Sequence, residues 1–217
     1  MIVEIPNVFS SEEVSDIIVK LSASEFIDGK KTAGWNARAV KNNEQLKSSD
    51  PHATALKDKV KTTLAKNLLF QATVRPKSIH SILFSRYEVG MSYGRHTDNA
   101  MMSGKWRSDV SFTIFLTSPD TYKGGELVIE GASRNLAYRL GSGCAIAYPS
   151  STLHQVTPIT EGSRWAIVGW VQSWIRDPAK REILYDLDTA RRSIFKVQGK
   201  NNDFDLITKS MANLMRR

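Results

Sequence analysis

The stretch from about Ser78 to Ile175 contains a series of short runs rich in β-branched and aromatic residues. Glycine, proline, serine or aspartate separates each run from the next, and the runs read SILFSRY, VSFTIFL, GELVIE, LAYRL, CAIAY, HQVTPI and RWAIVGWVQSWI. Several short strands at this spacing are typical of an antiparallel sandwich or jelly roll. About seven or eight such strands are enough for a double-stranded β-helix, so we expect a mainly β core.

Helical patterns precede this β-rich stretch. Ser10 and Glu13 form a capping box, and apolar residues then recur at the spacing of an amphipathic helix at Val14, Ile17, Ile18 and Leu21. A second helix is predicted to start at Asp50-Pro51, with the aspartate as N-cap and the proline as first helical residue. Trp35 lies in a turn-rich segment between the two helices, and we expect it to pack rather than to function.

Helical patterns also follow the β-rich stretch. Asp177-Pro178 repeats the start signal, and helices are predicted over 178–197 and 203–215. We therefore predict one mainly β domain with flanking α over residues 1–217. It comprises an N-terminal helical flank (1–77), a double-stranded β-helix core (78–175) and a C-terminal helical extension (176–217).

Charge and cysteine content limit the partners. The formal net charge is +8, but residues 81–175 hold 8 basic and 7 acidic residues, so the basic excess lies in the flanks. This distribution argues against a nucleic-acid partner, although a basic face assembled in three dimensions is left open.

No apolar run is long enough to span a bilayer, and the N-terminus lacks a signal-peptide pattern. The single Cys144, expected in the buried core, indicates a reducing, cytoplasmic location.

A candidate metal site lies inside the β-rich stretch. His96 and Asp98 are two residues apart, and side chains at this spacing share one face of a strand. His154, in a later strand-like segment, is a candidate third ligand. Two histidines and one carboxylate form the facial triad that leaves positions open on an octahedral Fe(II). The spacing alone is weak, because a solvated histidine and aspartate in a loop give the same pattern.

The residues around these ligands add a family resemblance. Tyr87, Gly90, Tyr93, His96 and Asp98 form the pattern Y-x-x-G-x-x-Y-x-x-H-x-D, and Arg164 follows His154 by ten residues in HQVTPITEGSRWAIVGW. These motifs resemble the prolyl-hydroxylase branch of the Fe(II)/2-oxoglutarate dioxygenases. The ending WIRDPAKREILYDLDTARRSIF resembles the bacterial PKHD-type hydroxylases in particular. The resemblance covers nearly the whole chain.

The resemblance implies a cosubstrate site. Arg164 starts an apolar, strand-like run, where a charge needs a partner, and a guanidinium can bind a carboxylate of 2-oxoglutarate with two hydrogen bonds. A surface arginine is the alternative. Tyr87 and Tyr93 are candidate contacts to the cosubstrate. Relatives carry a cosubstrate-contacting tyrosine on the strand that reads VSFTIFL here, and this chain offers Thr113 and Phe115 instead.

Two further features depend on the same resemblance. Trp170 lies six residues after Arg164, on the same strand face, and its family counterpart packs near the iron; a plain core residue is the alternative. Met101, Met102 and Trp106 follow the metal motif beside a Ser-Gly pair and suit a mobile lid over the substrate, or else a loop of ordinary packing residues.

The implied reaction consumes Fe(II), O2 and 2-oxoglutarate, releases succinate and CO2, and hydroxylates an unactivated C–H; ascorbate is expected to restore oxidised iron. The leading substrate is an amino-acid side chain, of prolyl type, in a protein or peptide. A small molecule or nucleic acid is the alternative within the enzyme class, and a non-catalytic, cupin-like metal-binding barrel is the alternative outside it. The sequence leaves the substrate and the oligomeric state open.

Overall fold

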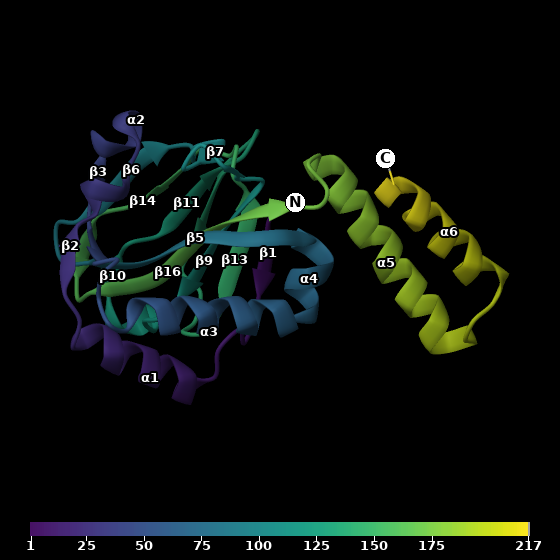
Figure 1. Cartoon of the computed structure of the whole chain (residues 1–217), viewed down its shortest axis with the longest axis horizontal. Helices are drawn as coiled ribbons and strands as arrows, with labels where there is room; N and C mark the ends of the chain where they lie inside the picture. The colour runs from purple at the N-terminus through teal and green to yellow at the C-terminus, as the bar shows by residue number, and fades with distance from the viewer. Residues whose placement is uncertain (217) are drawn as a thin grey trace.

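Two β-sheets face each other in the computed structural model, which describes residues 1–216 apart from the side chain of Asn36 (Figure 1). The seven-stranded sheet has the order β1 (Val3–Ile5), β13 (Ala145–Pro149), β9 (Val110–Phe115), β16 (Arg164–Ser173), β5 (Pro76–Tyr87), β4 (Glu44–Leu46) and β2 (Phe26–Asp28). The five-stranded sheet has the order β12 (Asn135–Tyr138), β11 (Leu127–Glu130), β14 (His154–Val156), β6 (Ser92–His96) and β3 (Lys41–Asn42).

The strand pairs of both sheets are antiparallel, and the predicted mainly β, jelly-roll core is confirmed. Two small two-stranded sheets complete it: β10 (Lys123–Gly124) with β15 (Ile159–Glu161), and β7 (Met101–Met102) with β8 (Trp106–Arg107). Apolar side chains from both large sheets meet between them, among them Phe115, Ile129 and Ile146. Two members of this apolar cluster, Tyr87 and Tyr148, also line a cavity between the sheets.

Three helices cover the outer face of the larger sheet: α1 (Ser11–Ser22), α3 (Ala53–Lys66) and α4 (Leu68–Val74) (Figure 1). Their apolar faces pack against Phe84, Phe112 and neighbouring strand residues, which forms the main hydrophobic core. The predicted capping box is present, since the backbone N–H of Glu13 donates to Ser10 Oγ at 3.2 Å and that of Ser10 to Glu13 Oε2 at 3.0 Å. The short elements are η1 (Gly29–Thr32), α2 (Trp35–Arg38) and η2 (Pro119–Thr121).

Three details differ from the sequence-based expectations. Helix α3 begins at Ala53 rather than at Pro51, because the Asp50 carboxylate accepts the backbone N–H of His52 at 2.8 Å and forms a turn before the helix. Trp35 is 89% exposed, because the four-residue α2 lies at the surface and offers no apolar face to the core. Cys144 is only partly buried, because it lies in the turn that precedes β13.

The C-terminal extension is a pair of helices, α5 (Pro178–Gln198) and α6 (Asn202–Arg216), which lie against each other to one side of the barrel (Figure 1). Both match their predictions to within one residue. The predicted cap is present, because Asp177 accepts the backbone N–H of Ala179 at 2.8 Å. The pair has a small core of its own around Leu184 and Met211. No helix within the described residues is long and apolar enough to cross a membrane.

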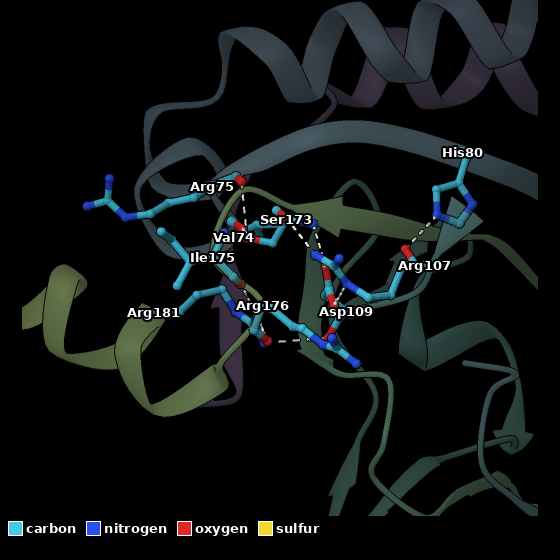
Figure 2. Close-up of polar contacts among 9 residues, drawn as sticks. All are labelled: Val74, Arg75, His80, Arg107, Asp109, Ser173, Ile175, Arg176 and Arg181. Atoms are coloured by element: carbon cyan, nitrogen blue, oxygen red, sulfur yellow. Dashed lines mark hydrogen bonds and ion pairs between the residues drawn. The ribbon is translucent and has the colours of Figure 1, made fainter. Parts of the chain in front are cut away.

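Asp109 joins the barrel to this extension (Figure 2). Its side chain is 5% exposed, and Arg107 donates to both carboxylate oxygens, at 2.6 and 2.8 Å. The backbone N–H of Ser173, at the end of β16, donates to Asp109 Oδ2 at 2.8 Å. Arg181 of α5 donates to the carbonyl of Ile175 at 2.7 Å, which holds the start of α5 beside the same carboxylate (Figure 2). The Asp109–Arg107 ion pair thus holds the end of β16, and Arg181 holds the start of α5 through backbone carbonyl groups.

We expect Asp109→Ala to lower the free energy of unfolding by about 3 kcal/mol, because it leaves a partly buried arginine and a backbone N–H without their acceptor. Asp120→Ala is the matched control, since Asp120 is exposed. Urea denaturation followed by circular dichroism measures both variants. Equal unfolding midpoints for the two variants would show that the Asp109 ion pair does not stabilise the fold.

Candidate active site

Two histidines come together because β6 pairs with β14. His96 and His154 are direct cross-strand partners, and their ring centroids lie 4.3 Å apart. Both side chains are buried, at 6% and 5% exposure. Tyr93, on the same strand as His96, stacks on the His96 ring with centroids 3.6 Å apart. Sheet register, rather than a flexible loop, therefore sets the positions of both imidazoles.

Each imidazole has a fixed tautomer. Nδ1 of His96 lies 2.8 Å from the carbonyl oxygen of Gly94, and Nδ1 of His154 lies 2.9 Å from that of Thr152. A carbonyl oxygen only accepts, so both Nδ1 atoms carry a proton and both Nε2 atoms are left with a free lone pair. Burial, then the neighbouring His154, lower the pKa of His96 to about 4. His96 is therefore neutral at neutral pH, as a metal ligand must be.

Asp98 lies two residues past the end of β6, so strand alternation does not position it. Instead, the Ser111 hydroxyl donates to Asp98 Oδ2 at 2.6 Å, and the Ser150 hydroxyl lies 2.8 Å from Ser111 Oγ. Because Ser111 has one hydroxyl proton, which it gives to Asp98, Ser150 donates to Ser111. Neither serine was predicted, because each is distant in sequence from Asp98 and no spacing rule connects them to it.

The three groups fit a divalent metal. One ligand atom each from His96, Asp98 and His154 lies within 4.8 Å of the other two. The donor set of two imidazole nitrogens and one carboxylate oxygen is that of the facial triad used by non-haem Fe(II). Asp98 Oδ2 lies 3.8 Å from His154 Nε2, and the Asp98 side chain is 7% exposed. The three predicted ligands therefore lie close enough together to bind one metal ion with little movement of their side chains.

Arg164 is the most unusual charged residue in the barrel. It is the first residue of β16, it is 1% exposed, and its cross-strand partner is Tyr87. Its guanidinium carbon lies 5.3 Å from the ring centroid of Tyr87 and 5.2 Å from that of Phe115. Within the described residues it forms no ion pair with a carboxylate, and its Nε has no hydrogen-bond partner. The fold thus buries a guanidinium among aromatic rings and leaves it without an anion.

All eight predicted site residues line one cavity of about 380 Å³ between the sheets, namely Tyr87, Tyr93, His96, Asp98, Thr113, His154, Arg164 and Trp170. Thr113 lies on β9 and Trp170 on β16, both with side chains toward this cavity. The indole Nε1 of Trp170 is buried and has no partner among the described residues. Tyr148 on β13 also lines the cavity, with its ring centroid 5.1 Å from that of His154.

Comparison with known proteins identifies the family. A model of the 2OG-Fe(II) oxygenase superfamily matches residues 82–172. A PKHD-type hydroxylase of Picosynechococcus sp. is 56% identical over 216 residues, which are 100% of this chain and 98% of the relative. One of Gloeothece citriformis is 58% identical over 218 residues, covering 100% of this chain and 99% of that protein. The chain belongs to the PKHD-type hydroxylases of the 2OG-Fe(II) oxygenase superfamily.

A solved structure shows the same fold. A prolyl hydroxylase from Trichoplax adhaerens, in complex with a peptide fragment of the hypoxia inducible factor oxygen degradation domain, matches with a TM-score of 0.56 at 18% identity. The match covers 84% of this chain and 86% of that chain. This match shows the fold, a jelly-roll core. The family and the convergent ligands show that the present chain is a 2-oxoglutarate-dependent enzyme, with Fe(II) and 2-oxoglutarate as its metal and cosubstrate.

The hydroxylase also has a polar strip that was not predicted. Lys41, Asn43 and Gln45 alternate along the extended segment that crosses from β3 to β4, and all three line the cavity at 4%, 3% and 1% exposure. The alternation of polar side chains in KNNEQ could have indicated a shared face. The pattern does not reveal that this face is buried, because strands of this composition usually face solvent.

Residues 99–108 contain the β7–β8 hairpin beside the cavity. Met102 and Ser103 line the cavity, and Met101 is 49% exposed. Trp106, at the other strand of the hairpin, stacks on the His80 ring with centroids 6.0 Å apart and an interplanar angle of 19°. The hairpin therefore has one packed strand and one strand at the cavity, and its role as a lid stays a prediction.

We expect Ser111→Ala to weaken divalent-metal binding about 10- to 100-fold, the usual effect of losing a partner that orients a metal ligand. Loss of the hydroxyl frees Asp98, which is past the end of its strand, to rotate away from the histidines. Titration with Mn²⁺ or Fe(II) under nitrogen measures the effect, with the exposed Ser133→Ala as control. Wild-type metal affinity in Ser111→Ala would mean that the backbone alone positions Asp98.

Proposed function

We propose that this enzyme hydroxylates an unactivated C–H of an amino-acid side chain in a protein or peptide. In this proposal His96, Asp98 and His154 hold Fe(II), and Arg164 anchors 2-oxoglutarate. The observation that carries the cosubstrate assignment is the burial of Arg164 at 1% exposure with no carboxylate partner among the described residues. A metal-binding barrel without oxygenase activity has no need of such a group.

The cost of burying Arg164 supports this assignment. An isolated charge taken out of water is strongly unfavourable, and buried charges are normally paired. The rings of Tyr87 and Phe115 compensate only in part, because a cation–π contact contributes about 0.5–2 kcal/mol. A bound dicarboxylate supplies the missing anion, and a guanidinium can hold a carboxylate with two parallel hydrogen bonds.

When bound, the iron and 2-oxoglutarate supply the oxidising chemistry, in which the cosubstrate becomes succinate and CO2. The chain itself positions the groups. The two histidines present free Nε2 atoms, and Ser111 holds Asp98 against them. The aromatic side chains around Arg164 exclude water from the cosubstrate, which strengthens its ion pair.

Hydroxyl groups near Arg164 are candidates for further contacts to the cosubstrate. Burial raises the pKa of Tyr87 and, well above its usual value, that of Tyr148, so both hydroxyls stay protonated and can donate. Thr113 lies beside Tyr148, and we assign this pair to the position at which relatives carry a tyrosine. Tyr93 holds the His96 ring by stacking, and Trp170, which lines the cavity, has a buried Nε1 with no acceptor among the described residues.

Two observations favour a peptide or protein substrate of prolyl type. The relatives are PKHD-type hydroxylases, and the Trichoplax prolyl hydroxylase of the same fold holds a peptide. The rim of the cavity includes Gly34 and Met102, and the exposed Trp35 and Met101 are next to these residues in the chain. Exposed apolar residues at a rim suit a chain that lies across it. The second candidate is a small molecule, which the depth of the cavity would also accept.

Two subsidiary proposals complete the assignment. The single cysteine suits a reducing compartment, so we place the enzyme in the cytoplasm. Ascorbate is proposed as the reductant that restores iron after turnovers in which no substrate is hydroxylated.

Succinate formation tests the proposed reaction. We expect the wild-type enzyme to convert 2-oxoglutarate to succinate with Fe(II), O2 and ascorbate, and to add one oxygen to a component of a peptide library, seen by mass spectrometry. His154→Ala should abolish both, because two ligands hold iron poorly. His52→Ala is the matched control, since His52 does not line the cavity. Metal binding without succinate formation in the wild type would favour the non-catalytic barrel.

A further inference from the structure

Lys41 is a second buried cation in the same cavity. It lies on β3, opposite Tyr93 of β6, and is 4% exposed. Its Nζ donates to Thr32 Oγ1 at 3.1 Å and lies 5.1 Å from the ring centroid of Tyr93. Within the described residues it forms no ion pair with a carboxylate, although salt bridges elsewhere in the chain use lysines of the surface. Lys41 on the smaller sheet therefore resembles Arg164 on the larger sheet, because neither forms an ion pair with a carboxylate among the described residues.

The positions of the two cations differ with respect to the metal. Lys41 lies over Tyr93, which stacks on the metal-site residue His96. Arg164 lies on the larger sheet, among Tyr87 and Phe115. One molecule of 2-oxoglutarate, held by the metal at one end and by Arg164 at the other, has no third carboxylate for Lys41. Lys41 is therefore available for another ligand.

The charges of the cavity lead to the same conclusion. Among the residues that line it, Lys41, Lys57 and Arg164 are cationic and Asp98 is anionic. Fe(II) adds two positive charges and 2-oxoglutarate removes two. Iron, Asp98, Arg164 and the cosubstrate, taken together, are neutral, so Lys41 and the half-buried Lys57 remain as uncompensated positive charges. A loaded enzyme of this kind attracts a substrate that carries a negative charge.

The ionisation of Lys41 is consistent with a ligand that is absent from the free protein. Burial lowers the pKa of Lys41 to about 8, against the opposing influence of Asp98 and Asp28. The amine is therefore mostly protonated at pH 7 and bears a desolvation cost that an anion would offset. Asn43, two residues on, is 3% exposed, and both polar atoms of its amide lack partners among the described residues.

We propose that Lys41 binds the α-carboxylate of the substrate, so that the hydroxylated residue is a free amino acid or the C-terminal residue of a peptide. This inference rests on the proposed function, because it places 2-oxoglutarate on Arg164. It narrows the two proposed substrate classes, peptide and small molecule, to compounds in which the target C–H lies close to a carboxylate. The main chain of an internal residue offers Lys41 only neutral carbonyl groups, and primary-amide probes separate an α-carboxylate from an acidic side chain.

Matched probe pairs test the inference. The probes are the free proteinogenic amino acids, their N-acetyl derivatives and acetylated tripeptides, each as the acid and as the primary amide. Affinity is measured by calorimetry under nitrogen on the enzyme loaded with Fe(II) and 2-oxoglutarate. The free and N-acetylated arms separate a free amino acid from a C-terminal residue. The variants are Lys41→Met and Lys41→Arg, with the exposed Lys66→Met as control.

We expect at least one acid to bind wild type roughly 30-fold more tightly than its amide, since one member of a desolvated charge pair is lost. Lys41→Met should remove this preference, Lys41→Arg should keep part of it, and Lys66→Met should keep all of it. The affinity for 2-oxoglutarate should be the same in wild type and Lys41→Met. The melting temperature of Lys41→Met should not fall, because an unpaired buried charge has been removed.

Three results would overturn the inference. One is a wild type that binds no acid better than its amide. Another is an acid preference that persists in Lys41→Met. The third is a loss of 2-oxoglutarate affinity in Lys41→Met, which would assign Lys41 to the cosubstrate. Failure of the proposed function is read separately, as absence of succinate formation by wild type under air, and does not depend on the probe pairs.

Discussion

A buried guanidinium that has no carboxylate partner within residues 1–216 is the constraint on which the site depends. Arg164 is enclosed by the rings of Tyr87 and Phe115 at the start of β16. The folded chain bears the desolvation cost of this charge in the free state, and a bound carboxylate relieves it. The same reasoning applies to Lys41 on the opposite sheet. Each of the two cations therefore favours the binding of an anion. We assign the anion at Arg164 to the cosubstrate and the anion at Lys41 to the substrate.

Arg164 is held in place by its strand, β16, which pairs with both β5 and β9. β16 is in the middle of the seven-stranded sheet, so its neighbours on each side place Tyr87 and Thr113 beside the cavity. The opposite sheet holds the histidines through the β6–β14 pairing. The Ser150–Ser111–Asp98 hydrogen bonds cross from the larger sheet to the metal site. Each sheet therefore supplies part of the site, and sheet packing brings the parts together.

Local patterns predicted the architecture well. The capping box at Ser10 and the start signal at Asp177 identified helices, and the short β-rich runs identified seven strands of the two large sheets. The runs did not include β6 or β1 to β4, the last four of which lie in the predicted helical flank. Local rules failed where a competing local interaction or an exposed position decided the outcome. The Asp50 carboxylate forms a turn in place of a helix cap, and Trp35 lies on a helix too short to be buried.

The site was predictable only where the chain resembles its family. The H-x-D pair, His154 and Arg164 belong to that resemblance, and the structure brings these residues into one cavity. Ser111 and Lys41 do not, because strand pairs between segments distant in sequence bring them to the site, and Ser150 reaches it through its hydrogen bond with Ser111. A serine in a strand carries no sequence signal that marks it as the hydrogen-bond partner of a metal ligand, so this role becomes visible only in the fold.

The measurement that tests the account most directly is the affinity for 2-oxoglutarate of Fe(II)-loaded wild type and Arg164→Ala, followed by the metal-to-ligand absorption band under nitrogen. Loss of one desolvated charge partner costs about 2–5 kcal/mol, so we predict 2-oxoglutarate binding weakened roughly 30-fold to several thousand-fold, with Fe(II) affinity unchanged. Arg164→Lys should lie between the two, because it keeps the charge and loses the two-pronged hydrogen bonding. Equal affinity in wild type and Arg164→Ala would contradict the account and remove Arg164 from the cosubstrate site.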